Sequence, residues 1–307
     1  MIDRFIEYIE SERRYSKLTA KNYRRDIENF ATWFCQQRGL QSKGLENFDV
    51  TKVCAEDVSD WIIYRMDTAK LQAATMNREL SSIKSFFKYL RKIGVIKSNI
   101  LKRIGSLKVS QPLPVFVPQS RMEEMLKDVK EQSYEHDIIS QRNSIIISLL
   151  YGCGIRLAEL LRITLGDISD GAVKIYGKGG KERLVPLLPE LEARIVRYTT
   201  VCRENGAIID DKSPLIFGKA GKALSRTTVQ RIVMQQMSAA GVQGRKSPHV
   251  LRHTFATDLL REGANMREIQ ELMGHSSLRS TQHYTHTSIR QLQGVYDKAH
   301  PHSRRKN

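Results

Sequence analysis

The sequence predicts a mainly α-helical protein with one small β-hairpin, divided into two domains. Three observations support this fold class. Apolar residues recur at helical spacing through residues 1–104 and again through most of the second half. A proline-containing stretch that shows neither the helical nor the strand period separates these two parts. Apolar and polar residues alternate on both sides of GKGGKE, residues 177–182, which is the pattern of a β-hairpin.

The first domain, residues 1–104, is predicted to contain four helices. They are Ile2–Arg14, Leu18–Gln37, a helix that begins near Ala55, and Ala74–Lys92. In the last of these, an apolar stripe faces the expected core: Met76, Leu80, Ile83, Phe87 and Leu90. The other face of that helix carries a row of cations, namely Lys84, Lys88, Arg91 and Lys92. This row is either an ordinary solvated surface or, given the charge of the whole chain, a surface that contacts phosphates.

Residues 105–117 are predicted to be a linker, because Pro112 and Pro114 favour an extended chain. The second domain, residues 118–307, is predicted to be mixed α+β. Its strands are AVKIY and RLVPL in the hairpin, with PLIFG as a further short extended piece. Its helices are Gln119–Lys130, Gln141–Tyr151, Arg156–Ile163, Ser225–Ala239, Pro248–Arg261, Met266–Met273 and a last short helix at Leu278–His286.

Local signals fix the ends of two of these helices. Ser247 followed by Pro248 indicates a helix start, with proline at the first helical position. Asn265 and Glu268 form a predicted capping pair for the next helix. Gly274 suits the end of that helix, because glycine readily adopts the left-handed conformation.

The composition indicates a polyanionic partner. The chain carries 50 Lys and Arg against 33 Asp and Glu, a formal charge of +17, which favours nucleic acid. A membrane surface is the alternative, but no long apolar run, lipidation motif or signal peptide is present. We therefore expect a cytoplasmic protein. The four cysteines show no C-x-x-C spacing, so we expect reduced and mostly buried thiols.

The candidate catalytic residues gather between Ser247 and Tyr284. His249 lies in the first turn of a helix, where free N–H groups favour an anion, and Arg252 follows at i+3 on the same face. His275 and Tyr284 follow within the same stretch. This set could hold a phosphodiester and attack it without a metal. A metal site at His249 and His253 is not expected, because the H-E-x-x-H motif would need glutamate where Val250 stands.

Two further cations upstream fit the same chemistry. Arg156 follows two glycines and either pairs with Glu159 at i+3 or grips one phosphate together with Arg252. Lys178 at the hairpin tip is either a solvated turn residue or a groove-entering proton donor. Its neighbours Lys181 and Arg183 could substitute for it in that role.

Taken together, the series Arg156, Lys178, His249-x-x-Arg252, His275 and Tyr284 resembles the motif series of tyrosine recombinases, closest to the bacterial Xer type. The resemblance extends through YGCGIRLAELLRIT, YGKGGKERLVPL, SPHVLRHTFATDLL and LMGHSSLRSTQHYTH. The N-terminal helices, in ERRYSKLTAKNYRRDI and MNRELSSIKSFFKYL, are also similar, so the likeness covers nearly the whole chain. It implies a core-binding domain and a catalytic domain that form a C-shaped DNA clamp. In the former, the residues expected to contact DNA are Lys21, Arg24, Arg25, Arg78, Lys84, Lys88 and Arg91.

The resemblance also implies a mechanism and partners. Tyr284 would attack the scissile phosphate to form a 3′-phosphotyrosyl link, with recombination proceeding through a Holliday junction and without cofactor or metal. The terminal segment, with Leu292, Val295 and Tyr296, would dock into a neighbouring subunit of a homo- or hetero-tetramer on DNA with inverted half-sites. A paralogous recombinase or a translocase is a further possible partner. Dimer resolution, inversion and integration all remain open as roles, and the alternatives are a type IB topoisomerase or a non-catalytic DNA-binding regulator.

Overall fold

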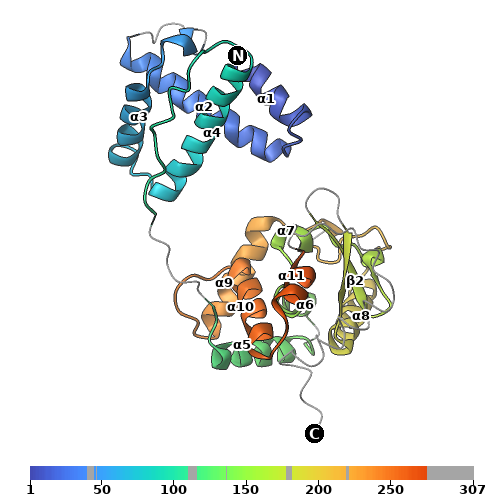
Figure 1. The fold of residues 1–307 in the computed structure, drawn as a ribbon. Helices are drawn as coiled ribbons and strands as arrows, with labels where there is room; N and C mark the ends of the chain where they lie inside the picture. Colours follow the sequence, from blue (N-terminus) through green and yellow to red (C-terminus); the bar gives the residue numbers. More distant parts are fainter. Residues whose placement is uncertain are drawn as a thin grey trace. The chain divides into compact units, whose positions relative to one another are not determined.

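We describe the fold from a computed structural model of the 307-residue chain, which covers residues 1–39, 45, 47–109, 116–135, 137–177, 182–218 and 221–274. The chain divides into two compact units, Met1–Gln111 and Pro112–Asn307, each with its own apolar core (Figure 1). The division falls inside the stretch predicted to be a linker. None of the described helices is long and apolar enough to cross a membrane.

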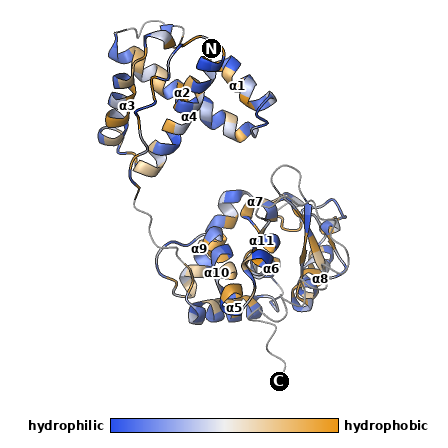
Figure 2. Ribbon diagram, viewed as in Figure 1, coloured by the Kyte–Doolittle hydropathy of each residue, from blue (hydrophilic) through white to orange (hydrophobic). Residues whose placement is uncertain are grey.

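The first unit contains the four predicted helices. They are α1 (Ile2–Ser11), α2 (Lys17–Gln37), α3 (Ala55–Asp67) and α4 (Ala73–Lys92), with a short 3-10 turn, η2 (Val50–Lys52), before α3. The predicted apolar stripe of α4 is buried at all five of its positions. Apolar and hydrophilic residues alternate along the helices of both units (Figure 2). The prediction of this helical unit is therefore confirmed, although α1 ends three residues earlier than expected.

An ion pair between the buried carboxylate of Asp26 and the partly exposed Arg78 joins α2 to α4, the helices that carry the predicted DNA-contacting residues. The carboxylate of Asp26 in α2 is fully buried and accepts hydrogen bonds from Arg78 and, at 2.8 Å, from the Ser82 hydroxyl, both in α4. Because removing one partner would leave an uncompensated buried charge, this contact fixes how the two helices lie side by side.

The second unit is built around α6, which packs against five other helices. Its helices are α5 (Gln119–Gln132), α6 (Ile138–Gly152), α7 (Leu157–Leu160), α8 (Pro189–Glu204), α9 (Arg226–Ala239), α10 (Pro248–Arg261) and α11 (Met266–Met273). The helix α6 begins before its predicted start because the Asp137 side chain caps it by accepting from the Ser140 N–H. The helix α7 is a single turn, shorter than predicted, and leads into a 3-10 turn, η3 (Leu165–Asp167).

The sheet of the second unit has three antiparallel strands in the order β1 (Ile168–Ser169), β2 (Ala172–Tyr176) and β3 (Glu182–Pro186). The predicted hairpin is β2–β3, in which Ile175 lies opposite Arg183. The strand β1 was not predicted, since two residues are too few to show a period. The segment PLIFG, predicted to be extended, forms only isolated bridges at Pro214 and Phe217.

The helix α8 was also missing from the sequence prediction, although its signals are present. Pro189 occupies the first turn, and Leu191, Ile195, Tyr198 and Cys202 recur at i+4 and i+3 and are all buried. Of the four cysteines, three are buried and Cys54 is exposed, in line with the expectation of mostly buried thiols.

Candidate active site

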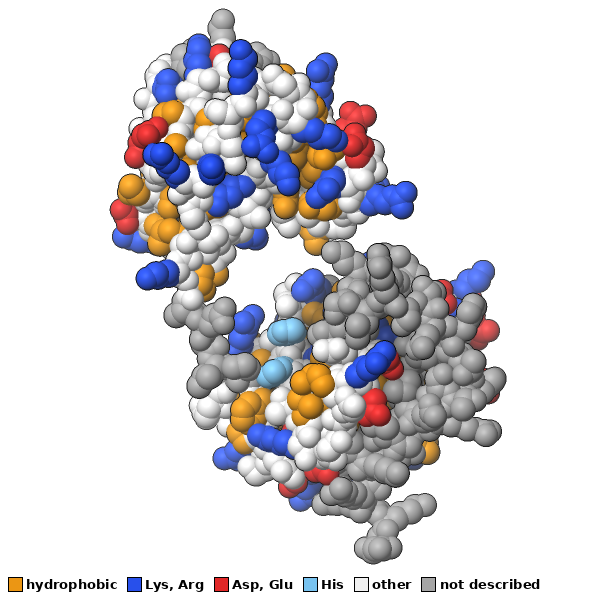
Figure 3. Space-filling model, in the orientation of Figure 1, with side chains coloured by type: hydrophobic (Ala, Val, Ile, Leu, Met, Phe, Trp, Pro, Cys, Tyr) orange, Lys and Arg blue, Asp and Glu red, His pale blue; other side chains and the backbone are white. Residues whose placement is uncertain are grey.

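The N-terminus of α10 presents His249 at the surface. Pro248 takes the first helical position as predicted, but the Ser247 side chain makes no capping hydrogen bond, and its hydroxyl is buried. His249 is exposed in the first turn, and His253 follows one turn later, partly buried. Histidine side chains lie at the visible surface of this unit in Figure 3. Desolvation by the protein atoms beside His249, and then the nearby positive charge of Arg252, lower the pKa of His249, so its neutral imidazole is favoured as a proton acceptor.

Arg252 does not share the open face of His249, contrary to the expectation from i+3 spacing. Its side chain is only 5% exposed. Its guanidinium donates to the carbonyl oxygen of Gly154 and, at 2.6 Å, to that of Met273, the last residue of α11. Gly154 can present its carbonyl there because its backbone is left-handed, with φ of +57°. The burial of Arg252 makes it a fixed donor.

Arg156 forms the predicted ion pair with Glu159 and also contacts the Met273 carbonyl oxygen, which accepts from Arg252. Its Nη1 lies 2.8 Å from Glu159 Oε1 and 3.5 Å from the Met273 carbonyl oxygen. The ion pair with Glu159 leaves 43% of the Arg156 side chain exposed, so pairing with Glu159 is compatible with the predicted phosphate contact. Arg156 and Arg252 both donate to the same oxygen atom, so their guanidinium groups are close enough to serve a single phosphate.

Glu159 is the buried centre of this cluster and was seen in the sequence only as an alternative partner for Arg156. Its carboxylate is 5% exposed and is also held by Arg183 at 2.8 Å and 3.2 Å. Burial alone would raise the pKa of Glu159, but the hydrogen bonds from Arg183 and from the Arg156 N–H lower it to about 2. Glu159 is therefore ionised at neutral pH.

Arg183 was suggested from the sequence as a substitute for Lys178 as proton donor, but the structure places it in the interior. Its side chain is only 6% exposed, and it donates to Glu159 and to the Leu272 carbonyl oxygen instead of reaching solvent. The sequence contains a signal for this burial. Arg183 and Val185 are two residues apart, so they share one face of the strand, and the apolar Val185 marks that face as the buried one.

The cluster has an excess of positive charge. Arg156, Arg183 and Arg252 lie within 4.0 Å of the one carboxylate of Glu159. Burial, followed by the neighbouring charge of Arg156, lowers the pKa of Arg252 to about 10. An anion placed against Arg156 and Arg252 would offset this repulsion, which suits the site to a phosphodiester and to the more negative transition state of its cleavage.

The other predicted catalytic residues, Lys178, His275 and Tyr284, lie outside the described residues, as does Lys181. The described chain nevertheless reaches the neighbours of two of them. Gly177 ends the described part of the hairpin before Lys178, and Gly274 precedes His275. Gly274 ends α11 in the left-handed conformation, and Asn265 and Glu268 form the capping box at its start, both as predicted. In the described part of the chain, no three His, Cys, Asp or Glu side chains are placed to hold a metal ion.

The predicted DNA-contacting residues of the first unit differ in their surroundings. Lys21, Lys88 and Arg91 are exposed, and no ion pair to another described residue involves them. Arg25 and Arg78 both form ion pairs with Asp26. Lys84 donates a hydrogen bond to the Ile104 carbonyl oxygen. Figure 3 shows Lys and Arg side chains spread across the visible face of this unit.

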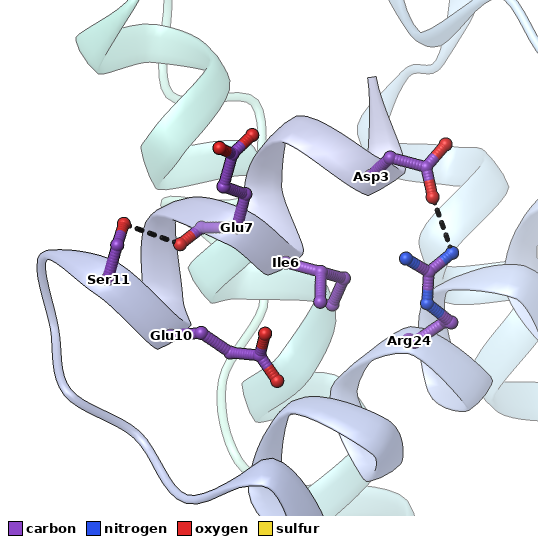
Figure 4. A pocket seen from close by; sticks show the side chains of 6 residues that line it. All are labelled: Asp3, Ile6, Glu7, Glu10, Ser11 and Arg24. Carbon is purple, nitrogen blue, oxygen red and sulfur yellow. Dashed lines mark hydrogen bonds and ion pairs between the residues drawn. The ribbon is translucent and has the colours of Figure 1, made fainter.

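Arg24 is placed least favourably for a phosphate contact. Its guanidinium lies 2.7 Å from Asp3 and 3.4 Å from Glu28. It also lines a surface pocket whose other residues are Asp3, Ile6, Glu7, Glu10 and Ser11 (Figure 4). Because the acidic side chains there repel phosphate, DNA contact at Arg24 would have to displace Asp3.

Comparison with known proteins covers both units. Residues 116–291 match the Phage integrase family, and residues 2–94 match its N-terminal SAM-like domain. Tyrosine recombinase XerC of Thermodesulfovibrio yellowstonii is 34% identical over 312 residues, which cover 99% of this chain and 97% of the relative. XerC of Syntrophus aciditrophicus is 32% identical over 316 residues, covering 99% and 98%.

Two solved structures share the fold. XerH bound to its difH substrate in a pre-cleavage complex has a TM-score of 0.66 at 20% identity, covering 96% of this chain and 81% of XerH. A lambda integrase dimer bound to a COC′ core site has a TM-score of 0.65 at 18% identity, covering 92% and 98%. The mainly helical fold class with a small sheet is thereby confirmed.

Proposed function

Because this chain belongs to the phage integrase family, we propose that it is a site-specific tyrosine recombinase that breaks and rejoins duplex DNA. The observation that carries the proposal is the convergence of Arg156 and Arg252 on one oxygen atom. Two guanidinium groups held at that spacing can bind both non-bridging oxygens of one phosphate. The XerC relatives, similar over nearly the whole chain, support recombination over a regulatory role without catalysis.

In this reaction the Tyr284 hydroxyl attacks the scissile phosphate in line, forming a 3′-phosphotyrosyl ester and releasing a 5′-hydroxyl. Arg156, Arg252 and His275 stabilise the negative charge of the transition state. Neutral His249 accepts the proton of Tyr284, in keeping with its lowered pKa. Lys178 donates a proton to the leaving 5′-oxygen. Since the ester conserves the bond energy, attack by the 5′-hydroxyl of a partner strand rejoins the DNA.

We also propose that the protein acts as a tetramer on two DNA duplexes in the cytoplasm. A lambda integrase tetramer bound to a Holliday junction has a similar fold, with a TM-score of 0.63 at 18% identity. Docking of the segment with Leu292, Val295 and Tyr296 into the next subunit would close four copies into a ring. A paralogous recombinase could supply alternate subunits of that ring, with a translocase as a further partner.

Plasmid assays distinguish recombination from simple strand relaxation. The DNA site is first located by footprinting on chromosomal DNA of the source organism. A supercoiled plasmid with two copies of this site is expected to yield recombinant circles, while a plasmid without the site stays supercoiled. Relaxation of the plasmid that lacks the site, without recombinants from the other, would favour a type IB topoisomerase instead.

A further inference from the structure

We propose that Arg183 is a positioning residue of the recombination reaction, fixing the last turn of α11 and the carboxylate of Glu159 relative to the β2–β3 hairpin. This inference rests on the proposed function and deepens it. Arg183 lies outside the group of residues assigned to the phosphate, the nucleophile or the leaving group. It acts through the segments that carry those residues.

The guanidinium of Arg183 donates hydrogen bonds to two segments, α7 and the end of α11. Its Nε donates to the Leu272 carbonyl oxygen at 3.0 Å, while its Nη1 and Nη2 donate to the two oxygens of Glu159 at 3.2 Å and 2.8 Å. A bidentate pair fixes orientation as well as distance, and the third bond, from Nε, ties the same rigid group to α11. Because the side chain is 6% exposed, solvent does not compete for these bonds.

The position of Arg183 in the chain makes it a junction of three segments. It lies in β3, opposite Ile175 of β2, and Lys178 closely precedes that strand in the sequence. Its partner Glu159 also accepts from Arg156. Its other partner, Leu272, lies in the last turn of α11, just before His275.

Gly274 shows how closely Arg183 packs against the end of α11. A Cβ atom added at Gly274 would lie 3.0 Å from Arg183 Nη1. The neighbouring carbonyl of Met273 accepts from Arg252 and Arg156. Three arginines therefore hold two consecutive carbonyl groups at the end of α11. Since Arg183 is the one of the three that lies in β3, it links the strand that follows Lys178 in the sequence with Arg156 and Arg252.

The first test measures cleavage and DNA binding separately. The probe is a nicked suicide duplex carrying the footprinted site, and the variants are Arg183→Met and Arg183→Lys. At saturating DNA, the single-turnover cleavage rate of Arg183→Met is expected to fall about 100-fold, as misplacement of reacting groups does. The half-site Kd should change by less than about threefold, because binding rests on many phosphate contacts. Arg183→Lys should recover only part of the rate, since an ammonium cannot form the fork.

A sulfur-substituted duplex separates positioning from proton donation. If the 5′-bridging oxygen is replaced by sulfur, the leaving group is a thiolate, which departs without a proton because thiol pKa values are about 8.5. The control Lys178→Met should cleave this duplex nearly as fast as the wild type. Arg183→Met should remain slow on it. Full rescue of Arg183→Met by sulfur would overturn the proposal and make Arg183 a proton donor.

A second pair of variants keeps the proposal testable if Arg183→Met folds poorly. Glu159→Gln removes the carboxylate charge that loss of Arg183 would leave buried without its strongest partner. The double variant Glu159→Gln/Arg183→Met should fold. It should nevertheless cleave far more slowly than Glu159→Gln alone, because the Leu272 carbonyl oxygen still lacks its donor Arg183. Equal cleavage by those two variants would refute the positioning role. Failure of the wild type to cleave the duplex at all would instead refute the proposed function.

Discussion

At the residue scale, Gly154 determines where the carbonyl that accepts from Arg252 lies. Its φ is +57°, and a Cβ atom added there would lie 2.3 Å from Cδ1 of Phe255 in the core. We predict that Gly154→Ala lowers the free energy of unfolding by about 3 kcal/mol or more, because left-handed strain adds to overpacking. Urea denaturation measures this decrease.

Gly244→Ala is the matched control for that substitution. Gly244 has a similar φ of +74°, but an added Cβ would have no atom within 4 Å. Its destabilisation should therefore reflect backbone strain alone, about 1 kcal/mol. Equal destabilisation of both variants would show that the contact with Phe255 is unimportant.

Glu159 gives the site a pH dependence whose sign follows from its pKa. The pKa of Glu159 is lowered from 4.5 to about 2 in the folded protein, so its ionised form stabilises the fold. This contribution, about 3 kcal/mol, is fully present above pH 4.5 and disappears as the pH falls towards 2. We predict that the difference in unfolding free energy between the wild type and Glu159→Gln shrinks over this range. A difference that stays constant with pH would contradict the assignment.

The residue types of the phosphate-binding cluster could be predicted from the sequence, but their burial could not. The spacing of His249 and Arg252 suggested one shared open face, whereas Arg252 is buried against Gly154 and Met273. Helical spacing fixes which residues are neighbours on one helix. It does not reveal that α11 and the loop at Gly154 cover one of them, because those contacts span 21 and 98 residues of sequence.

At the scale of elements, strongly periodic segments were predictable and short ones were not. The helices α2, α4, α9, α10 and α11 fit their apolar periods, and the β2–β3 hairpin fits its alternation. The strand β1 is two residues long, and α7 is one turn, so tertiary contacts decide their conformation. The sequence does carry signals for α8, namely Pro189 in its first turn and its apolar spacing, so the prediction that lacks this helix is wrong.

The exposed cations of α4 give a prediction about DNA binding. Replacing Lys88 and Arg91 by glutamine should weaken half-site binding and lower the slope of log K against log salt by about 2, one unit for each phosphate that is no longer neutralised. Lys92→Gln, on the same helix, is the control, because Lys92 already pairs with Glu12 at 3.2 Å and lies over Tyr8. Fluorescence anisotropy across a salt series measures both slopes. An unchanged slope in the double variant would exclude these two residues as phosphate ligands.

At the scale of the whole molecule, the proposed reaction needs only organic groups. Arginine, histidine, lysine and tyrosine side chains supply charge stabilisation, proton transfer and the nucleophile. We therefore predict that strand cleavage proceeds in EDTA without added nucleotide, at a rate within about twofold of that in magnesium. Single-turnover cleavage of the suicide duplex in both buffers tests this. A strict magnesium requirement would point to a metal-dependent nuclease.

The central claim is that Tyr284 forms a covalent bond to DNA while the rest of the chain holds the phosphate. The most direct measurement compares the wild type with Tyr284→Phe on the nicked suicide duplex. It reads covalent protein–DNA adducts by denaturing electrophoresis and half-site binding by gel shift. We predict adducts with the wild type and none with Tyr284→Phe, at nearly equal affinity, because only one hydroxyl is removed. Covalent adducts or strand cleavage with Tyr284→Phe would contradict this account.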